Sequence, residues 1–572
     1  MSFSEFYQRS INEPEQFWAE QARRIDWQTP FTQTLDHSNP PFARWFCEGR
    51  TNLCHNAIDR WLEKQPEALA LIAVSSETEE ERTFTFRQLH DEVNAVASML
   101  RSLGVQRGDR VLVYMPMIAE AHITLLACAR IGAIHSVVFG GFASHSVAAR
   151  IDDAKPVLIV SADAGARGGK IIPYKKLLDD AISQAQHQPR HVLLVDRGLA
   201  KMARVSGRDV DFASLRHQHI GARVPVAWLE SNETSCILYT SGTTGVPKGV
   251  MLGEDGLLAN VTDIAAYLAV GERDTILIVR PLYHGAVLTG EFLTALWKGL
   301  RVCFDSGVFH PSLLPGLLRE SGATVVCGTP TLLSLAARFL RGPQQKLRAV
   351  CVSGECMDAR TGLRLAEAFP AADIYHVYGL TEAGPRVSYL PPALFRDHPD
   401  SVGIPLRTAA VQIRRRDGRP AAPGEIGSLY VRGRSIMLGY YGAPEATDAV
   451  LQNGWLYTGD AALLDENGLL YIKGREDDMI NKAGMNIYPQ ELESALLADP
   501  RVREVTAYGF RSPSGVQIGL KLAGDFGSVR EVRALCRDVL PAYAMPAKIE
   551  CLPELDKNGS GKLKRGEEHA GI

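Results

Sequence analysis

Residues 110–161, RVLVYMPMIAEAHITLLACARIGAIHSVVFGGFASHSVAARIDDAKPVLIVS, decide the fold of this chain. Short apolar runs at 110–115, 135–139 and 157–161 predict buried strands, and the intervening segments 120–130 and 144–153 have the spacing of helices. This βαβαβ order favours a mostly parallel sheet with helices on its faces. The sequence therefore predicts an α/β fold.

The same alternation continues beyond this stretch. Further strands are predicted at 192–195, 235–239, 324–326 and 349–352, so the α/β region reaches the middle of the chain. Near residue 420 the sequence pattern changes: turn-forming residues become frequent around short predicted strands at 428–431 and 469–472. We expect a large N-terminal domain over residues 1–474 and a small α+β domain over residues 475–572.

The composition excludes several classes of protein. Of the 572 residues, 46% are hydrophobic and 22% are charged, which is typical of a globular protein. The formal net charge of −3 gives no global field for nucleic acid or an anionic membrane, so an anionic ligand must be bound locally. The ten cysteines form no C-x-x-C pair and are expected to be reduced. We expect no membrane span, because no apolar run reaches about 18 residues, and a cytoplasmic location, because the N-terminus lacks a signal-peptide pattern.

The sequence TSGTTGVPKG, residues 240–249, directly follows a predicted strand. Glycines allow a tight turn, hydroxyl groups donate hydrogen bonds and a lysine supplies positive charge, so the segment predicts a phosphate-binding loop. The alternative is an ordinary polar surface loop, which the preceding strand and the following Pro-Lys-Gly disfavour. It is not a Walker A loop, because Pro247 stands where the second glycine is needed. The candidate phosphate ligands are Thr240, Ser241, Gly242, Thr243, Thr244, Gly245 and Lys248.

Further blocks follow this loop in a fixed order: SGE at 353–355, YGLTE at 378–382, YTGD at 457–460, GREDD at 474–478 and NGSGKLKR at 558–565. With the loop, they resemble the adenylate-forming superfamily of acyl-CoA synthetases, carrier-protein-charging adenylation domains and luciferases. The resemblance implies a large multi-subdomain N-terminal domain and a small mobile α+β C-terminal domain. It also implies that a carboxylic acid reacts with ATP to give acyl-AMP and pyrophosphate, and that a thiol then takes the acyl group.

The resemblance also implies roles for individual residues. The phosphate loop would hold the β- and γ-phosphates of ATP, Thr381 would contact the α-phosphate and Glu382 would hold Mg²⁺. Tyr378 would stack on adenine, and Asp460 would bind the ribose hydroxyls. The remaining residues assigned to the nucleotide are Gly354, Glu355, Gly379 and Arg475. Each block alone also suits a strand end, a turn or a solvated charge, and only the ordered set favours the nucleotide site.

Catalysis and thiol transfer are assigned to a different set of residues. Lys562 would reach the α-phosphate and the substrate carboxylate, although a lysine ten positions from the end is otherwise a mobile tail charge. Asp477 would be the hinge between the two domains, and Gly484 would lie along the incoming pantetheine. Arg167 and Lys170 would contact the nucleotide of CoA, a solvated basic loop being the alternative.

The two halves of the sequence resemble different relatives and therefore suggest different acyl substrates. Residues 1 to about 245 resemble bacterial propionyl-CoA synthetases, whereas the remainder resembles medium-chain, aryl or biosynthetic acyl-activating enzymes, so a mosaic joined at residues 245–249 is predicted. Gly379 stands where short-acid enzymes carry a tryptophan, which predicts room for a longer or aromatic acid. Arg386 is expected either to meet a second anionic group or to lie at the surface. The predicted acyl pocket comprises His284, Gly285, Ala286, Gly328, Thr329 and Gly379.

The leading functional hypothesis is an ATP-dependent acid:CoA ligase. Within the enzyme class, the alternatives are transfer of the acyl group to the phosphopantetheine of an acyl carrier protein, and propionate–CoA ligase activity proper. A nucleotide-binding regulator without catalysis is disfavoured by the presence of Lys248, Glu382, Asp460 and Lys562. A luciferase-like oxygenase is a more distant possibility. The expected ligands are ATP, Mg²⁺, CoA and a small carboxylic acid, with no nucleic acid.

Overall fold

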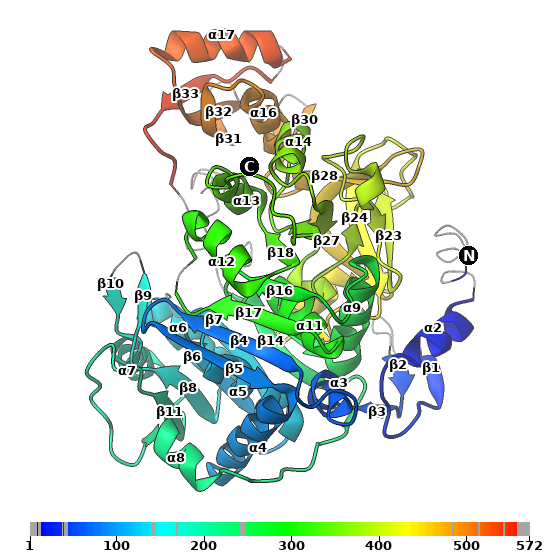
Figure 1. The fold of residues 1–572 in the computed structure, drawn as a ribbon. Coiled ribbons are helices and arrows are strands. Elements are labelled where there is room, and N and C mark those ends of the chain that lie inside the picture. The colour runs from blue at the N-terminus through cyan, green and yellow to red at the C-terminus, as the bar shows by residue number, and fades with distance from the viewer. Residues whose placement is uncertain are drawn as a thin grey trace.

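The computed structural model describes residues 9–556 except 10–12, 37, 39–43, 140–142, 168–169, 241–246, 308, 483–484, 513–514 and 542–543. Two large β-sheets with flanking helices form the body of these residues (Figure 1). The elements closest to the C-terminus, drawn orange to red, lie together at one end of the molecule. The α/β fold predicted from the sequence is confirmed.

The first sheet has eight strands among the described residues, and six of them are parallel. In its central strand β6 (Arg110–Met115), Leu112 and Tyr114 pack on one face of the sheet with helices α6 (Ser144–Ala154) and α7 (Tyr174–Gln184). Val111 and Val113 pack on the other face with α4 (Phe86–Ser102) and α5 (Ala119–Ile131). This alternation explains why the strand reads as continuously apolar, because both faces are covered. In order, the strands are β12 (Asp209–Asp211), β11 (His191–Val195), β8 (Leu158–Ala162), β6 (Arg110–Met115), β7 (Ile134–Phe139), β14 (Thr234–Thr240), β15 (Lys248–Gly253) and β25 (Gly439–Tyr440).

The second sheet has nine strands in the described part of the chain, and its central strands are also parallel. Helix α9 (Glu254–Tyr267) and a π-helix at Leu288–Leu293 pack against it, and helices α12 (Leu314–Ser321), α13 (Pro330–Ala337) and α14 (Ala359–Ala368) connect or follow its strands. In order, the strands are β22 (Ile404–Pro405), β21 (Ser388–Tyr389), β20 (Asp373–Tyr378), β19 (Ala349–Val352), β18 (Val325–Gly328), β16 (Thr275–Ile278), β17 (Arg301–Asp305), β4 (Leu69–Ser75) and β5 (Glu80–Thr85).

An N-terminal segment packs against this body. It contains α2 (Pro14–Ala22), β1 (Gln33–Asp36), β2 (Arg44–Cys47), β3 (Arg50–Thr51) and α3 (Leu53–Ala57). Its aromatic cluster includes Trp18, Trp45 and Phe46, and the guanidinium of Arg434 lies 4.3 Å from the Phe46 ring centroid. Arg434 also forms a buried ion pair with Asp255 of α9. The segment is therefore held to the body through Arg434 and its ion-pair partner on α9.

The last third of the described chain contains two smaller sheets of three or more strands, and an antiparallel pair formed by β29 (Ile480–Lys482) and β30 (Met485–Ile487). The first consists of β23 (Ala409–Arg414), β24 (Gly427–Gly433), β26 (Leu451–Gln452), β27 (Trp455–Leu464) and β28 (Leu470–Arg475). The second consists of β31 (Val502–Ser512), β32 (Gly515–Gly524) and β33 (Lys548–Cys551), and shares its own apolar core with α16 (Pro489–Leu497) and α17 (Val529–Val539). Arg360 of α14 donates hydrogen bonds to the carbonyls of Leu497 and Ala498, at the end of α16. This contact joins the C-terminal elements to the body.

The predicted elements agree closely with those observed. The strands predicted at 110–115 and 349–352 have the same bounds in β6 and β19, and the other predicted strands and helices differ by at most three residues at either end. Differences of this size at element ends are expected, because the last residues of a strand or helix make only part of its hydrogen bonds.

Candidate active site

The phosphate loop connects two antiparallel strands. Thr240 is the last residue of β14 and pairs with Lys248, the first residue of β15, so the two ends of the loop are held side by side. Next to them, a Cβ on Gly249 would lie 2.8 Å from Ile237 Cγ2, which is too close for an unchanged neighbour. The glycine therefore permits the tight strand pairing at the base of the loop. Ser241, Gly242, Thr243, Thr244 and Gly245 lie outside the described residues.

Lys248 and Glu382 lie on either side of one aromatic residue, Tyr440. The Lys248 ammonium lies 5.1 Å from the centroid of the Tyr440 ring, and the Tyr440 hydroxyl donates to Glu382 Oε1 at 3.0 Å. Burial, followed by the nearby Glu382, raises the pKa of Tyr440, so the phenol remains a donor. The amide of Met437 also donates to the carbonyl of Glu382, at 2.9 Å. The predicted phosphate-loop lysine and the predicted metal ligand are thus brought together.

Thr381 and Glu382 form a single helical turn, Thr381–Ala383, directly after β20. Among the described residues no group of three or more His, Cys, Asp or Glu side chains has the arrangement of a metal site. A lone carboxylate suits Mg²⁺ bound to a nucleotide, because this ion often uses one or two carboxylates together with substrate phosphates and water. Glu382 therefore fits the role predicted for it, with its second oxygen not engaged by Tyr440.

Tyr378, Asp460 and Arg475 form a second group. The Tyr378 hydroxyl donates to Asp460 Oδ2 at 2.5 Å, which connects the end of β20 to β27. Arg475 Nη1 lies 3.5 Å from Asp460 Oδ1 and donates to the Thr458 carbonyl at 2.8 Å. Burial raises the pKa of Asp460, while the Tyr378 hydroxyl and Arg475 act to lower it. An oriented carboxylate of this kind suits hydrogen bonds to ribose hydroxyls.

Gly354 and Glu355 follow β19, at the carboxyl end of the second sheet. Gly354 has a φ of +94°, in the region that favours glycine, and a Cβ there would lie 3.6 Å from Thr329 Cγ2. The Thr331 hydroxyl donates to Glu355 Oε2 at 2.8 Å. Thr329 caps the N-terminus of α13 by accepting a hydrogen bond from the Leu332 amide. Gly354, which the sequence assigns to the nucleotide, thus lies next to Thr329, which it assigns to the acyl pocket.

The other predicted acyl-pocket residues lie at the ends of neighbouring elements. His284 immediately precedes helix α10 (Gly285–Val287), and Ala286 lies within that helix. Gly285 is buried, and a Cβ there would lie 3.1 Å from Leu238 and 3.5 Å from Pro385. Gly328 ends β18, where a Cβ would lie 2.7 Å from Leu333. These glycines permit close packing between β14, the segment after β20, and α13.

The expectation that Gly379 opens space for a larger acid is wrong. A Cβ at Gly379 would lie 1.6 Å from the carbonyl oxygen of Pro385 and 3.0 Å from Arg386 Cα. The volume that a side chain would occupy is therefore filled by the backbone that returns after Thr381–Ala383. The absence of a side chain at position 379 is required by this close approach and leaves no additional room.

The surface role considered for Arg386 is also wrong, because only 2% of this residue is exposed. Its backbone is held by Asn260 of α9, which donates to the Arg386 carbonyl at 2.9 Å and accepts from its amide at 3.3 Å. Sequence position alone does not reveal this burial, because the chain from Pro385 turns inward beneath the site only in the folded molecule.

The predicted CoA and hinge residues are only partly described. Lys170 is exposed on β10 (Lys170–Ile172) and pairs across a short hairpin with Arg167 of β9 (Gly165–Arg167). Asp477 is exposed and accepts a hydrogen bond from Arg475 Nε at 3.1 Å. Gly484, Lys562 and the side chain of Arg167 lie outside the described residues. The guanidinium of Arg475 therefore contacts both Asp477, the predicted hinge residue, and Asp460, the predicted ribose ligand.

The sequence did not identify Tyr440 or the residues that brace the phosphate loop. Tyr239 donates to Asp153 Oδ2 of α6 at 2.6 Å, and the Arg150 guanidinium lies 5.2 Å from the Tyr239 ring centroid. Burial raises the pKa of Asp153, and the Tyr239 hydroxyl acts against this shift. Two signals in the sequence could have indicated these contacts. Tyr239 stands at the end of the strand that precedes the loop, and the segment GYYG at 439–442 carries two adjacent tyrosines.

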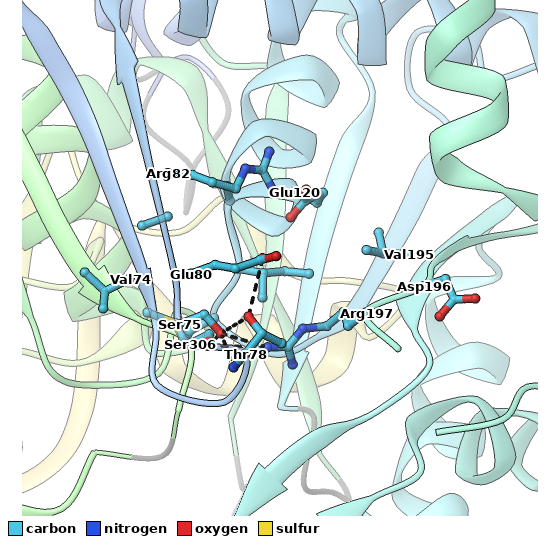
Figure 2. Close-up of a pocket in the computed structure, with 14 residues that line it drawn as sticks. Val74, Ser75, Thr78, Glu80, Arg82, Glu120, Val195, Asp196, Arg197 and Ser306 are labelled. Carbon is cyan, nitrogen blue, oxygen red and sulfur yellow. Dashed lines mark hydrogen bonds and ion pairs between the residues drawn. The ribbon is translucent and has the colours of Figure 1, made fainter. Parts of the chain in front are cut away.

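A cavity of about 130 Å³ lies elsewhere, between the β4–β5 hairpin and the carboxyl ends of β6 and β11 (Figure 2). None of the predicted site residues lines it. Several of its polar groups are already paired: Arg82 pairs with Glu120 at 2.5 Å, Ser306 donates to Ser75 at 2.9 Å, and Arg197 pairs at 2.5 Å with Glu77, which does not line the cavity. We therefore assign these residues to the joint between the two sheets rather than to the active site.

Comparison with known proteins covers the whole chain. Residues 58–441 match the family described as AMP-binding enzyme, residues 3–57 match the acetyl-coenzyme A synthetase N-terminus, and residues 491–562 match the AMP-binding enzyme C-terminal domain. The propionate–CoA ligase of Escherichia coli is 54% identical, and the one of Salmonella typhimurium is 50% identical. Each alignment covers 99% of this chain and 95% of the relative.

Solved structures share the fold of this chain. The o-succinylbenzoate coenzyme A synthetase of Bacillus subtilis in complex with AMP has a TM-score of 0.76 at 25% identity, covering 89% of this chain and 96% of that one. An anthranilate CoA ligase in complex with anthranoyl-AMP shares the fold, with a TM-score of 0.78 at 21% identity over 90% of this chain and 96% of that one.

The comparisons correct one prediction from the sequence. A mosaic joined at residues 245–249 is not supported, because the propionate–CoA ligases align with the chain on both sides of these residues. Among the described residues, no helix is long and apolar enough to cross a membrane.

Proposed function

Because the chain belongs to the AMP-binding enzyme family, we propose that it is an ATP-dependent carboxylic acid:CoA ligase that forms acyl-AMP and pyrophosphate and then acyl-CoA and AMP. The observation that carries the proposal is the juxtaposition of Lys248, Tyr440 and Glu382 beside the base of the phosphate loop. Propionate is the reference acid, because it is the substrate named for two relatives that align along nearly the whole chain.

In the first half-reaction, an oxygen of the acid attacks the α-phosphorus of ATP, and pyrophosphate leaves. Lys248 contributes positive charge beside the departing phosphates, and Thr381 donates its hydroxyl to the α-phosphate. Glu382 would hold Mg²⁺, which neutralises phosphate charge when bound. Asp460 and Tyr378 orient the ribose and adenine, so that the reacting atoms are aligned. Lys562 is proposed to supply a further positive charge from the C-terminal end.

In the second half-reaction, the thiol of CoA displaces AMP from the acyl group. We propose that residues 1–474 and 475–572 form two domains, and that rotation at Asp477 replaces Lys562 by the thiol channel. The Arg475–Asp477 hydrogen bond supports a specific orientation at this junction. Arg167, Lys170 and Gly484 are proposed to contact CoA. A cytoplasmic location remains a prediction from the N-terminal sequence.

The test of this proposal supplies ATP, Mg²⁺, a panel of acids and either free CoA or a phosphopantetheinylated carrier protein. We expect pyrophosphate release that depends on the acid, followed by consumption of the free CoA thiol and formation of AMP. Consumption of the carrier thiol alone would favour the carrier-loading alternative. Pyrophosphate release with none of the acids would contradict the ligase assignment.

A further inference from the structure

Arg280 links two parts of the proposed active site that are far apart in the sequence. It lies two residues beyond the end of β16, and its Nη1 donates at 3.0 Å to the hydroxyl of Ser353, the residue directly after β19. Because β18 lies between these two strands, the guanidinium spans the carboxyl edge of the sheet. Both residues are buried, with 7% of Arg280 and 3% of Ser353 exposed. Open α/β sheets bind ligands beyond this edge.

On the nucleotide side, Ser353 fixes the turn that follows β19. Its amide donates at 3.0 Å to the carbonyl of Gly328, the last residue of β18. The next residue, Gly354, has a φ of +94° and is assigned to the nucleotide. A shift of Ser353 would therefore move Gly354, because a rigid peptide unit joins the two residues. Arg280 thus acts on the proposed nucleotide site through Ser353.

On the acyl side, Arg280 is held by Glu291. Arg280 Nη2 donates at 2.6 Å to Glu291 Oε1, and this carboxylate is fully buried. Glu291 belongs to the π-helix Leu288–Leu293, a rare geometry that is frequent at functional sites. In the same helix, the Thr289 hydroxyl donates at 3.1 Å to the carbonyl of Gly285. The π-helix therefore connects Arg280 to Gly285, a predicted acyl-pocket residue.

We propose that Arg280 is a positioning residue that makes the binding of the acid and the binding of ATP reinforce each other. This inference rests on the proposed ligase function and requires no contact between Arg280 and either substrate. The ligand that binds first orders the bridge from Glu291 to Ser353, so the second ligand meets a site that is already ordered. The coupling is reciprocal: propionate tightens ATP binding by the same factor as ATP tightens propionate binding.

The experiment measures binding of α,β-methylene-ATP, which cannot release pyrophosphate, by calorimetry with Mg²⁺ and with or without saturating propionate. In the unaltered chain we expect propionate to tighten nucleotide binding about fivefold or more, as is typical of coupled sites. In Ser353→Ala, which leaves the Arg280–Glu291 pair in place, this coupling factor should fall below about twofold. Such a fall is reasonable, because losing a hydrogen bond to a charged group commonly changes an equilibrium about tenfold. Acid-dependent pyrophosphate release from ATP provides a separate measure of ligase activity.

Arg348→Met is the matched control. Arg348 directly precedes β19 and binds Asp274, which directly precedes β16, at 2.6 Å. It therefore links the same two strands at their amino ends, away from the proposed site. This variant should keep the coupling factor of the unaltered chain. An equal fall in Arg348→Met and Ser353→Ala would mean that general loosening of the sheet is the cause, and would overturn the inference.

Two substitutions of Arg280 extend the test. Arg280→Met removes both links and should abolish the coupling, whereas Arg280→Lys keeps the charge but not the planar fork, so part of the coupling should remain. An unchanged coupling factor in Ser353→Ala would overturn the inference even if Arg280→Met does not fold. A factor near one in the unaltered chain would also overturn it. The absence of acid-dependent pyrophosphate release with every acid would instead contradict the ligase function itself.

Discussion

The Tyr440 hydroxyl donates a 3.0 Å hydrogen bond to Glu382, while the ring of the same residue lies 5.1 Å from the Lys248 ammonium. Tyr440 therefore sets the spacing between the Lys248 ammonium and the Glu382 carboxylate, which both act on the triphosphate of ATP in the proposed reaction. The cation–π contact positions Lys248 without neutralising it, and the hydrogen bond fixes one carboxylate oxygen of Glu382.

Tyr440→Phe should weaken the response to Mg²⁺ and ATP. The ring beside Lys248 remains, but Glu382 loses a donor, so we expect about a three- to tenfold increase in the Mg²⁺ concentration needed for half-maximal pyrophosphate exchange. The same change at the neighbouring Tyr441 serves as the control. Equal Mg²⁺ dependence in the two variants would show that the hydrogen bond does not position Glu382.

Asp460→Asn should raise the KM for ATP about ten- to hundredfold while altering the KM for the acid much less. The amide preserves the size of the side chain but removes the charge that accepts from Tyr378 and pairs with Arg475. Asp417→Asn, in an exposed turn of the same region, is the matched control. Steady-state kinetics with each substrate varied in turn make the comparison, and equal changes in both KM values would argue against a ribose contact.

Lys562→Ala should lower acid-dependent ATP–pyrophosphate exchange by about two orders of magnitude or more, because a charge near the α-phosphate is lost. Thioester formation from supplied acyl-AMP and CoA should be largely retained. Lys564→Ala, two residues further on, controls for the loss of a basic residue in this terminal segment. Undiminished exchange in Lys562→Ala would remove the residue from the proposed mechanism.

Arg360→Ala should change the balance between the two half-reactions. Arg360 donates to the carbonyls of Leu497 and Ala498, and thereby holds α16 against α14. Loss of a hydrogen bond of about 1 kcal/mol should shift the ratio of exchange rate to thioesterification rate about fivefold. Arg364→Ala, on the same helix, is the control. Equal ratios in the two variants would mean that this contact does not influence domain orientation.

Stability should decrease on acidification below pH 7. Burial lowers the pKa values of His122, His135 and His376 to about 4 from an ordinary value of 6.5. Between these values the unfolded chain binds more protons than the folded one, so the free energy of unfolding falls as the pH falls through this window. Glu254 acts in the opposite direction, because burial raises its pKa to about 7 from 4.5 and the folded state keeps that proton.

His122→Phe tests this balance. His122 stacks on Phe304 with ring centroids 4.0 Å apart, so an aromatic replacement retains much of the packing. Between pH 7 and pH 5, the variant should lose about 2 kcal/mol less unfolding free energy than the unaltered chain. Urea unfolding at both pH values provides the measurement, and His217→Phe at an exposed position is the control. Equal losses in the variant and the unaltered chain would contradict the assigned titration of His122.

The sequence identified most of the fold and the separate parts of the site, but not how the parts meet. Buried strands such as β6 carry an apolar pattern that local sequence is enough to show. Motif residues such as Lys248 and Tyr378 lie at strand ends, where the order of elements places them. The crowding at Gly379 and the burial of Arg386 depend on a backbone segment that folds back from Pro385. No local pattern encodes such a return, because the segment is held by a residue distant in sequence, Asn260 of α9.

Arg475 pairs with Asp460 and also binds Asp477, so one guanidinium serves both the proposed nucleotide site and the proposed hinge. If rotation at Asp477 alters the Arg475–Asp460 pair, domain orientation and nucleotide affinity become thermodynamically linked. The linkage is reciprocal: an orientation that AMP stabilises is also the orientation that retains AMP most strongly. Release of AMP after thioester formation would then itself favour the return of the C-terminal domain for the next cycle.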